Sequence, residues 1–446
     1  MDPATIGLVA FGLMLILLAM RVPIAFALMG VATLAAFTIF AFRTGTFMPE
    51  RALRATASIV FSNSFDLIHS FDLSMIPLFV VLGNIAYRAG ITTAVYNSAR
   101  VWLQQLRGGV AMASIVGCGG FSAITGSSIA CASTMGRICT PEMLRMGYDK
   151  RLATASVAAG GTMGSLIPPS VLFIVYAIFT ETSVSKLFLA GILPGFLTLV
   201  GFVTVVVIWS AVDPKVAPVA AQRATRRERL HAALEAWPAI LIFLIVVVGI
   251  YGGFFTATAA AAVAVVVTTA IGFAQRRLSL RDMWEAVRET CVQSTSIFIV
   301  AAAAKIFVAA IALTGLAPAL VQTVSEAQLS FPVLLLCICA VYLALGMFLD
   351  PIGIMVLTLP LAVPMVEAYG MNLIWFGVVV VKLLEIGLIT PPVGLNVFVL
   401  SNVVGRAAPI GAIFAGIWRF LCADVIVLGL ILAFPAISLI LSESVK

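Results

Sequence analysis

The chain has 446 residues, of which 62% are hydrophobic and only 10% are charged. A soluble globular domain is about half apolar and about a quarter charged. So few charges cannot cover a water-facing surface of this size. The composition therefore excludes a soluble globular protein, and we interpret the sequence as an integral membrane protein that crosses the lipid bilayer many times.

The net charge of +7 is typical of a membrane protein whose cytoplasmic loops collect Lys and Arg, and no stacking motif for nucleic acid accompanies it. The seven cysteines form no CxxC pair, and the two histidines, His69 and His231, are far apart. This pattern disfavours a zinc or haem site. Phosphate-binding, nucleophile and metalloprotease motifs are also missing from the sequence. We therefore expect neither an enzyme nor a bound cofactor.

Apolar stretches long enough to span a membrane occur along most of the chain. The first begins at the N-terminus and reads as a retained span, because it lacks the features of a signal peptide. The hydrophilic runs 43–70, 213–236 and 275–289 are predicted as loops or, at most, interfacial helices. In chain order the predicted spans are 4–20, 22–42, 71–88, 152–180, 187–210, 237–252, 254–274, 290–313, 372–403 and 409–440.

Two further apolar regions, at about 109–140 and 331–368, do not read as plain spans. Each is interrupted near its middle by a polar or glycine-containing cluster, and each ends in prolines. Irregular backbone at membrane depth survives only when it is buried in protein or lines a cavity. Both regions are therefore predicted to be re-entrant helical hairpins.

The basic loops predict an orientation, because Lys and Arg collect on the cytoplasmic side. The clusters within 215–231 and 276–281 are expected there, and so is the segment 137–151. The N-terminus then lies in the periplasm. Arg43, Arg51 and Arg54 would lie outside, which conflicts with the same rule.

Two Pro-Pro segments carry an internal repeat. GTMGSLIPPS (161–170) and LEIGLITPPVG (384–394) share the spacing Gly-x-x-x-Pro-Pro, and each follows one of the predicted hairpins. We predict an all-α polytopic protein of two inverted repeats, 1–212 and 237–446, joined by a basic cytoplasmic linker, 213–236. Such paired, broken segments mark the binding site of a transporter. The matched residues are Gly164, Pro168 and Pro169 in the first repeat and Gly387, Pro391 and Pro392 in the second.

A helix broken inside a membrane leaves unpaired N–H groups on one half and unpaired carbonyls on the other. The N–H groups favour an anionic substrate, and the carbonyls can bind a hard cation such as Na⁺. Thr390 adds a hydroxyl beside the second break, where the first has Ile167. The two half-sites are therefore expected to differ chemically. The alternative is that each Pro-Pro merely kinks a span.

Polar residues inside the apolar regions complete the candidate site. Gly126, Ser127 and Ser128 form a small-residue turn that either offers oxygens to an ion or lets helices pack closely. Asp350 lies in an apolar region, where an ionisable group is costly. It either binds a cation or a proton, or caps the following helix, and we favour the cap or another supporting role.

Three other ionisable residues lie in apolar stretches. Lys382 and Glu385 are three residues apart and can pair on one helix face. Lys305, in AAAAKIFVAA, needs a partner or a cavity. Contact with an anionic substrate is open for each of them, but buried pairing or snorkelling is favoured.

At these residues the sequence resembles the large membrane subunit, the DctM-type permease, of the tripartite ATP-independent periplasmic (TRAP) transporters. One departure is FTATAAA (255–261), where the family pattern would have a Pro and a Glu after the phenylalanine. The stretches that carry the resemblance are FDLSMIPLFVVLGNIAYRAGI (71–91), RGG (107–109), GSSIACASTMGRICTPEMLRMGY (126–148), GTMGSLIPPS, LFLAGILPG, GMFLDPIGIMVLTLPLAVP (346–364) and EIGLITPPVGLNVF (385–398).

The resemblance implies a multi-pass protein of the bacterial inner membrane with two partners, a small four-helix DctQ-type membrane subunit and a DctP-type periplasmic substrate-binding protein. It also implies Na⁺-coupled import of a small organic acid by an elevator-type movement of the hairpin domain against a scaffold. The Na⁺ and substrate region would comprise Gly126, Ser127 and Ser128, the backbone of 164–169 with Gly164, Pro168 and Pro169, the stretch Gly346 to Asp350, and Thr390, Pro391, Pro392 and Gly394.

Two other functions remain open at this point. One is a stand-alone ion-coupled anion carrier with the same inverted-repeat plan. The other is a membrane-embedded enzyme or an assembly scaffold. The sequence does not specify the substrate, because in the tripartite design the soluble protein largely selects it.

Overall fold

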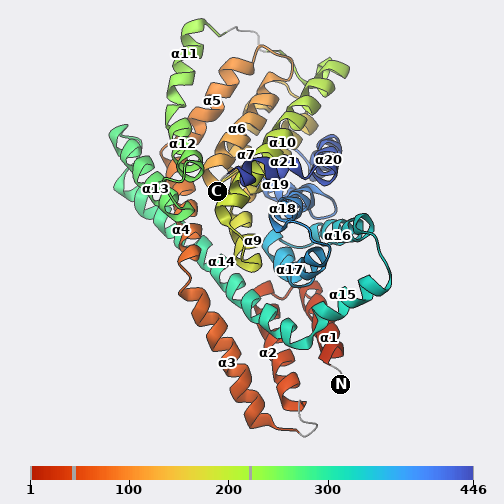
Figure 1. Cartoon of the computed structure of the whole chain (residues 1–446). Helices are drawn as coiled ribbons and strands as arrows, with labels where there is room; N and C mark the ends of the chain where they lie inside the picture. The colour runs from red at the N-terminus through yellow and green to blue at the C-terminus, as the bar shows by residue number, and fades with distance from the viewer. Residues whose placement is uncertain (1–2, 43–46, 220–223, 445–446) are drawn as a thin grey trace.

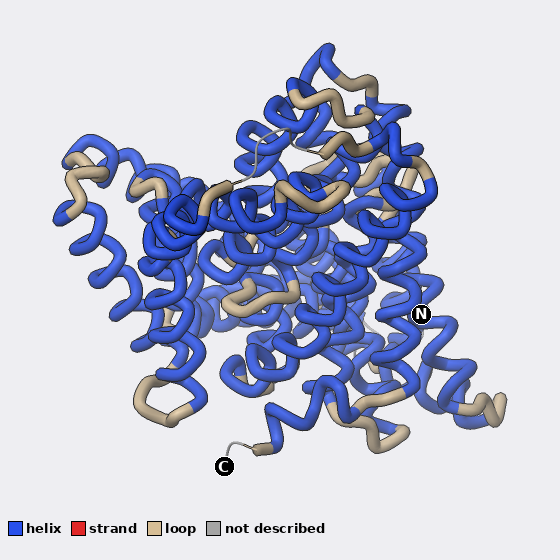
Figure 2. Tube along the Cα trace, turned by 90° about the horizontal axis from the view of Figure 1, so that it is seen from above, coloured by secondary structure: helices blue, strands red, loops and turns tan. Residues whose placement is uncertain are grey.

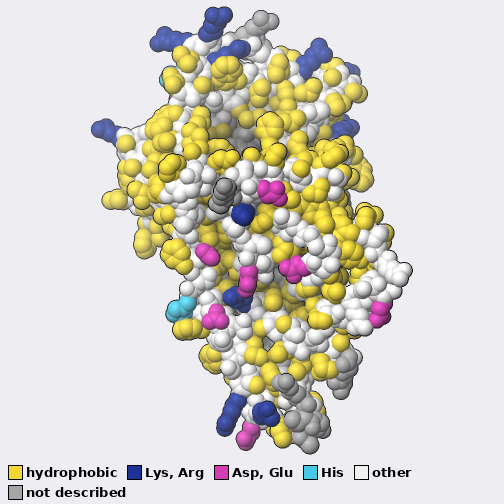
Figure 3. Space-filling view, in the orientation of Figure 1, with side chains coloured by type: hydrophobic (Ala, Val, Ile, Leu, Met, Phe, Trp, Pro, Cys, Tyr) yellow, Lys and Arg dark blue, Asp and Glu magenta, His cyan; other side chains and the backbone are white. Residues whose placement is uncertain are grey.

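The computed structural model describes residues 3–42, 47–219 and 224–444, and within these ranges the chain folds into helices without a β-strand (Figures 1 and 2). Hydrophobic side chains spread over much of the face in Figure 3, and many Lys and Arg project at its two ends, while several Asp and Glu lie in between. This distribution suits a protein whose middle lies in lipid.

Within the described residues, seven helical segments have the length and composition to cross a membrane, and a bent pair would make an eighth. The bent pair is α11 (Arg226–Glu235) with α12 (Trp237–Tyr251), which meet at 43°. The prediction of a polytopic all-helical protein is thereby confirmed. The seven segments are α2 (Ile24–Phe42), η1 with α4 (Phe71–Arg88), α10 (Val184–Val212), α13 (Ala257–Ala274), α14 (Leu280–Thr314), α17 (Pro351–Ala368) and α20 (Ile410–Ala433).

The two regions expected to be hairpins are helix pairs in the structure. Hairpin 1 consists of α6 (Gly109–Thr125) and α7 (Ser128–Arg145), and hairpin 2 consists of α16 (Phe331–Gly346) and α17. Each pair turns at the polar or glycine-containing cluster that the sequence places at its middle. α7 extends to Arg145, beyond the predicted hairpin end at 140, whereas α17 ends at Ala368, the predicted end of the second region. Pro141, Pro360 and Pro364 lie inside these helices and do not end them.

The two Pro-Pro segments break helices, as predicted. The first break separates α8 (Lys150–Thr162) and η2 (Met163–Ser165) from α9 (Val171–Thr180), and the second separates α18 (Leu373–Ile389) from α19 (Leu395–Val404). α7 of hairpin 1 packs against α19, while α17 of hairpin 2 packs against α9. Each hairpin therefore contacts a half-helix of the other Pro-Pro segment.

Helix α18 is the centre of the fold. Every residue from Trp375 to Ile389 is buried, which is the environment that a helix apolar on all sides requires. α8, α10, α16 and α20 pack around it. A smaller core lies between α1 (Pro3–Ala19), α2 and α14, where alanines let the helices pack closely.

Several helices were missed. The helices α5 (Ile91–Leu103) and α15 (Leu316–Glu326) were not predicted. The run 43–70, predicted as a loop or an interfacial helix, contains the helix α3 (Pro49–Ile68), so only the second alternative fits there. For 275–289 too only the helix alternative fits, because α14 already begins at Leu280. Ser279 and Asp282 form a capping box that starts this helix.

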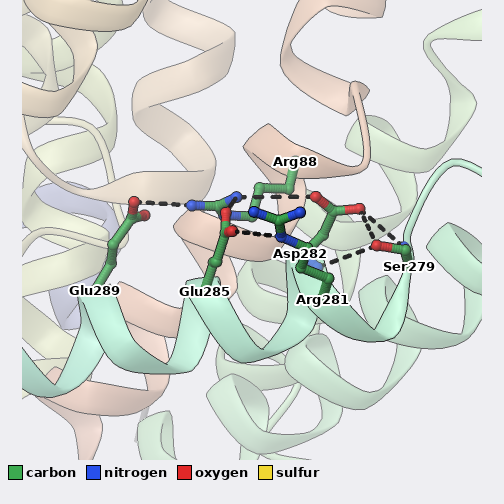
Figure 4. A network of polar contacts seen from close by, with 6 residues as sticks. All are labelled: Arg88, Ser279, Arg281, Asp282, Glu285 and Glu289. Atoms are coloured by element: carbon green, nitrogen blue, oxygen red, sulfur yellow. Dashed lines mark hydrogen bonds and ion pairs between the residues drawn. The ribbon is translucent and has the colours of Figure 1, made fainter.

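An ion-pair network joins α4 to the first turns of α14 (Figure 4). Arg88 Nη1 lies 2.8 Å from Glu285 Oε2, and Nη2 lies 2.8 Å from Glu289 Oε1. Asp282 lies at 3.9 Å from Nη1, and the Arg88 side chain is only 15% exposed. One guanidinium therefore fastens two helices that are distant in the sequence.

Two of the basic segments lie at one end of the molecule. The backbone N–H of Asp149 donates to Val216 O at 2.9 Å, which joins the α7–α8 loop to the linker. The start of α3, which carries Arg51 and Arg54, lies at the opposite end from α11 (Figure 1). Arg43 falls outside the described residues. The orientation inferred from the basic loops stays a prediction. In that orientation Arg51 and Arg54 would still lie on the periplasmic side, against the rule that basic residues collect in the cytoplasm.

Candidate functional site

The turn of hairpin 1 is built from the residues predicted for it. Gly126 ends α6 with φ +62°, a left-handed conformation that favours glycine. Ser127 then caps α7, because its Oγ accepts from the N–H of Ala130 at 3.4 Å. A Cβ on Gly126 would lie 2.2 Å from Pro169 O, so this turn touches the first Pro-Pro break directly.

Hairpin 1 is docked on the first broken helix through Ser128. Its Oγ donates to Thr162 O at 3.3 Å and is hydrogen-bonded to the hydroxyl of Ser165. Gly164 makes the close approach possible, since an added Cβ would lie 2.7 Å from the carbonyl carbon of Ser127. Ser165 was not predicted as a site residue, although it stands inside the repeated segment GTMGSLIPPS.

The first break is closed and buried. Pro168 and Pro169 are joined by a cis peptide bond, and both are buried. Ser170 caps α9 by accepting from the N–H of Phe173 at 3.3 Å, and its hydroxyl donates to Ser165 O. The half-helix that follows the break is therefore capped by a side chain of its own segment.

Hairpin 2 is docked on the second broken helix by direct backbone contact. A Cβ on Gly346 would lie 2.9 Å from the Cα of Gly387, and the reciprocal distance is 2.7 Å. Gly164 and Gly387, the matched glycines of the two Pro-Pro segments, thus each touch the turn of the preceding hairpin. The structure brings these predicted residues together in both places.

Asp350 is a helix cap, as favoured from the sequence. Its Oδ2 accepts from the N–H of Gly353 at 2.9 Å and so caps α17. Its side chain lies at the molecular surface, and no recorded interaction joins it to the second break.

The second break is open at the surface. Pro391 and Pro392 are also joined by a cis peptide bond, but both are exposed. Thr390 Oγ donates to Ile386 O at 2.6 Å, which leaves the lone pairs of this hydroxyl available. Gly394 begins α19 with φ +58°. The two Pro-Pro breaks therefore differ in solvent exposure as well as in side-chain chemistry.

The two docked turns lie around one packed centre. η2 of the first break packs against α18, and the Nδ2 of buried Asn396, on α19, donates to Ala158 O on α8 at 3.4 Å. Asn396 was missed because nothing in the sequence links it to α8. Hydroxyls, carbonyls and helix ends lie at each docked turn, and these are the kinds of group that can bind a hard cation or an anion. Among the described residues no group of three His, Cys, Asp or Glu side chains could hold a metal ion.

The predicted pair of Lys382 and Glu385 is present and fully buried on α18. The ammonium lies 3.1 Å from Glu385 Oε2 and 2.6 Å from Asp424 Oδ1, on α20. Asp424 was not foreseen as a partner. Lys305, by contrast, is partly exposed on α14, and no polar partner is recorded for it within the described ranges.

The segment that departs from the family pattern still forms an ordered turn. Thr256 caps α13 by accepting from the N–H of Ala259 at 3.2 Å, so the helix starts without a proline. Cys118, Cys131, Cys139 and Cys339 are buried, as small hydrophobic side chains often are, whereas Cys291, Cys337 and Cys422 are exposed.

Membrane-length helices around two hairpins, each docked on a broken helix, define a multi-pass membrane protein with a transporter fold. The same fold occurs in the YdaH transporter of Alcanivorax borkumensis, with a TM-score of 0.63 over 98% of this chain and 99% of that one, at 14% sequence identity. The chain belongs to the family of the DctM component of tripartite ATP-independent periplasmic transporters, whose model matches residues 11–437.

Relatives in this family are named as transporter permeases, so the chain is not an enzyme. It is 34% identical, over 89% of this chain and 90% of the relative, to the C4-dicarboxylate TRAP transporter large permease protein DctM of Pseudomonas aeruginosa. It is 32% identical to the isethionate TRAP transporter permease protein DctMQ of Oleidesulfovibrio alaskensis, over 89% of this chain and 60% of that protein.

Proposed function

We propose that the chain is the large membrane subunit of a Na⁺-coupled secondary transporter, which imports a small organic acid across the bacterial inner membrane. One observation carries the proposal: Gly164 and Gly387 each bring a hairpin turn against the backbone of a broken helix. Such junctions collect carbonyls, N–H groups and hydroxyls in one place. They are the arrangement by which broken helices bind a coupling ion and an anionic substrate.

The Na⁺ ions would be bound near the two docked turns, and the substrate between them. Ser127, Ser128 and Thr390 supply hydroxyl oxygens, and the neighbouring backbone supplies carbonyls. The N-terminal ends of α9 and α19 would face the acidic group of the substrate. The DctM and DctMQ relatives named for C4-dicarboxylate and isethionate support a small acid as the substrate class.

The two Pro-Pro segments with their hairpins would form two inverted repeats, 1–212 and 237–446, joined by the linker 213–236. In this proposal the hairpins and broken helices move together, as an elevator, against a scaffold that includes α2, α4 and α14. The matched Gly-x-x-x-Pro-Pro spacing and the exchange of packing partners between α7, α19, α17 and α9 support this division.

Two partners belong to the proposal. A small DctQ-type membrane subunit would complete the membrane part, and a DctP-type periplasmic protein would deliver the substrate. The family description as one component of a tripartite transporter supports both.

Uptake into proteoliposomes tests the function. The chain is reconstituted with its small subunit, and accumulation of labelled succinate and of a panel of small acids is measured with and without a Na⁺ gradient and a periplasmic extract. We expect uptake only with both. Uptake without the extract would favour a stand-alone carrier, and absence of Na⁺-driven uptake under either condition would exclude both transporter proposals.

A substitution pair locates the ion region. Ser128→Ala removes a hydroxyl from the docked turn, and we expect it to raise the Na⁺ concentration needed for half-maximal uptake. Ser114→Ala is the matched control, because Ser114 is buried in the same hairpin and donates only to Ala111 O of its own helix, at 2.8 Å. Equal Na⁺ dependence in both variants would remove Ser128 from the ion site.

A further inference from the structure

A closed group of charges lies at the centre of the fold, away from the docked turns. Lys382 Nζ on α18 donates to Asp424 Oδ1 on α20, to Glu385 Oε2 and, at 2.9 Å, to Thr198 Oγ on α10. The Lys382, Glu385 and Asp424 side chains are fully buried. The ring of Phe202, whose centroid lies 5.9 Å from Nζ, covers another side of the ammonium.

The charges of this cluster do not balance. One ammonium faces two carboxylates, which gives +1 − 1 − 1 = −1 if all three groups are ionised. A buried uncompensated charge is so unfavourable that the group takes up a counter-ion or becomes neutral. One oxygen of each carboxylate, Glu385 Oε1 and Asp424 Oδ2, is buried and has no hydrogen-bond partner among the described residues. The imbalance and the unpartnered oxygens are in the same place.

We propose that Glu385 and Asp424 hold one exchangeable proton between them, which makes the Lys382 cluster neutral. A proton fits better than a metal cation, because a hard cation collects about six or more oxygen ligands, whereas only these two carboxylate oxygens are free. When the proton binds, a hydronium ion loses one O–H bond and becomes water, while one carboxylate oxygen gains an O–H bond; no other covalent bond changes. The site is separate from the Na⁺ region proposed above and does not depend on it.

Glu385 lies close to the exposed second break. Glu385 precedes the end of this helix at Ile389 by four residues, or about 6 Å at 1.5 Å per residue, and the exposed Pro391 and Pro392 follow. Gly387, between them, contacts hairpin 2. Loss of the proton would therefore place a net charge inside the helix that carries the second break.

No other charged side chain balances the cluster within the described part of the chain. The helices packed against α18 carry ionisable groups, but none has a recorded hydrogen bond or ion pair with the three residues. Arg419 on α20 stacks on Trp209 with its Cζ 3.9 Å from the ring, Tyr176 on α9 donates to Leu373 O, and Tyr342 on α16 pairs with Thr358.

Infrared spectroscopy of the full-length purified chain tests the proposal. The C=O stretch of a protonated carboxyl is recorded from neutral to alkaline pH. We expect the wild type to lose a band equivalent to one carboxyl as the pH rises. Glu385→Gln and Asp424→Asn should each abolish this titrating band, because a single carboxylate balances Lys382 without a proton.

Lys382→Met makes the opposite prediction. Without the ammonium both carboxyls must be neutral, so the band should grow about twofold and persist to higher pH. Glu142→Gln is the control, because Glu142 is already paired with Arg100 at 2.6 Å, and it should leave the band unchanged. The proposal is overturned if the wild-type protein shows no titrating band. It is also overturned if the band is still present in both Glu385→Gln and Asp424→Asn. Thermal unfolding verifies that each variant is folded.

Discussion

Gly164 and Gly387 have the same task in two places, since each lets a hairpin turn touch the backbone of a broken helix. Around Gly164 the nearest atoms to an added Cβ belong to the backbone of Ser127 and Ser128, at 2.7–2.8 Å. Backbone atoms cannot give way as the end of a flexible side chain can. At the residue scale, the site therefore depends on the absence of side chains as much as on the hydroxyls that it offers.

Substituting Gly164 by Ala should separate hairpin 1 from the first break. Overpacking of this kind costs about 1–3 kcal/mol, so we expect a lower unfolding temperature and weaker Na⁺ dependence of uptake. The control is Gly119→Ala in α6, where the nearest atom to a Cβ lies at 3.5 Å, and where Ala is preferred to Gly in a helix. Equal stability of the two variants would contradict the close contact.

The site residues that were predicted from the sequence share one property: each was recognised from residues only a few positions away in the chain. Lys382 and Glu385 stand three apart on one helix, and the turn residues stand in a recognisable small-residue cluster. Asp424 was missed because it is 42 residues from Lys382 and on another helix, α20. Only the packing of α18 against α20 brings it near, and no periodicity in either segment encodes that contact.

At the scale of elements, caps decide where the helices of the site begin. Ser127 caps α7, Ser170 caps α9 and Asp350 caps α17. Each cap satisfies an N–H group that the helix itself cannot pair. The starts of the helices around both docked turns are therefore fixed by short polar side chains.

Two substitutions of Asp350 separate capping from ion binding. Asp350→Ala should lower the stability by about 1 kcal/mol, the usual cost of losing a cap, whereas Asp350→Asn should leave it almost unchanged because Asn caps equally well. Thermal unfolding measures both. If Asp350→Asn keeps its stability but loses Na⁺-dependent uptake, the carboxylate is a ligand and not only a cap.

Asp149, which caps α8, makes a pH prediction. The guanidinium of Arg151 donates to both carboxylate oxygens, at 3.1 and 3.0 Å, and holds the pKa of Asp149 below its ordinary value. A lowered folded-state pKa adds stability above the unfolded pKa and loses it as the pH falls through the folded value. We therefore expect this stabilisation to fade below about pH 4.

Asp149→Asn keeps the cap but removes the titrating group. Its unfolding temperature should lie below that of the wild type at neutral pH, and the difference should shrink as the pH falls below about 4. A difference that stays constant down to acid pH would show that the Asp149 carboxylate does not contribute in this way. Asp213→Asn is the comparison variant, because Asp213 caps the short helix η3 (Pro214–Val216) and has no ion pair within 4 Å among the described residues.

The helices that sequence reasoning missed have a common cause. α3, α5 and α15 alternate apolar and polar positions, so they fall short of the uninterrupted apolar run by which a span is recognised. Their stability comes from neighbours: α3 packs on α2 and α14, and α5 packs on α6. The hairpins and breaks were predicted because Gly and Pro mark them directly in the sequence.

At the scale of the whole molecule, a few long-range contacts tie separate segments together. Arg88 joins α4 to α14 across about half the chain, and its carboxylate partners all lie within the first turns of α14. Removing one cation therefore leaves Asp282, Glu285 and Glu289 facing one another. Such like charges repel, and α14 is the longest helix of the described structure.

Arg88→Ala should loosen the beginning of α14. We expect faster amide hydrogen exchange over residues 280–290 and a lower unfolding temperature that added salt partly restores, because salt screens the remaining carboxylates. Arg281→Ala is the control, since Arg281 is 89% exposed and contacts only Glu285 within this network. Identical exchange in the two variants would show that α4 does not hold α14 through Arg88.

The contact between Gly346 and Gly387 has a consequence for inheritance. An added Cβ on either glycine would lie 2.7–2.9 Å from the Cα of the other, so neither position has room for a side chain unless the backbone shifts. Every missense change of a glycine codon introduces at least one additional carbon. No substitution at one position makes room at the other, because both changes add atoms to the same space. These two codons therefore have no compensating partner mutation between them, and the junction of hairpin 2 can be preserved only by keeping both glycines.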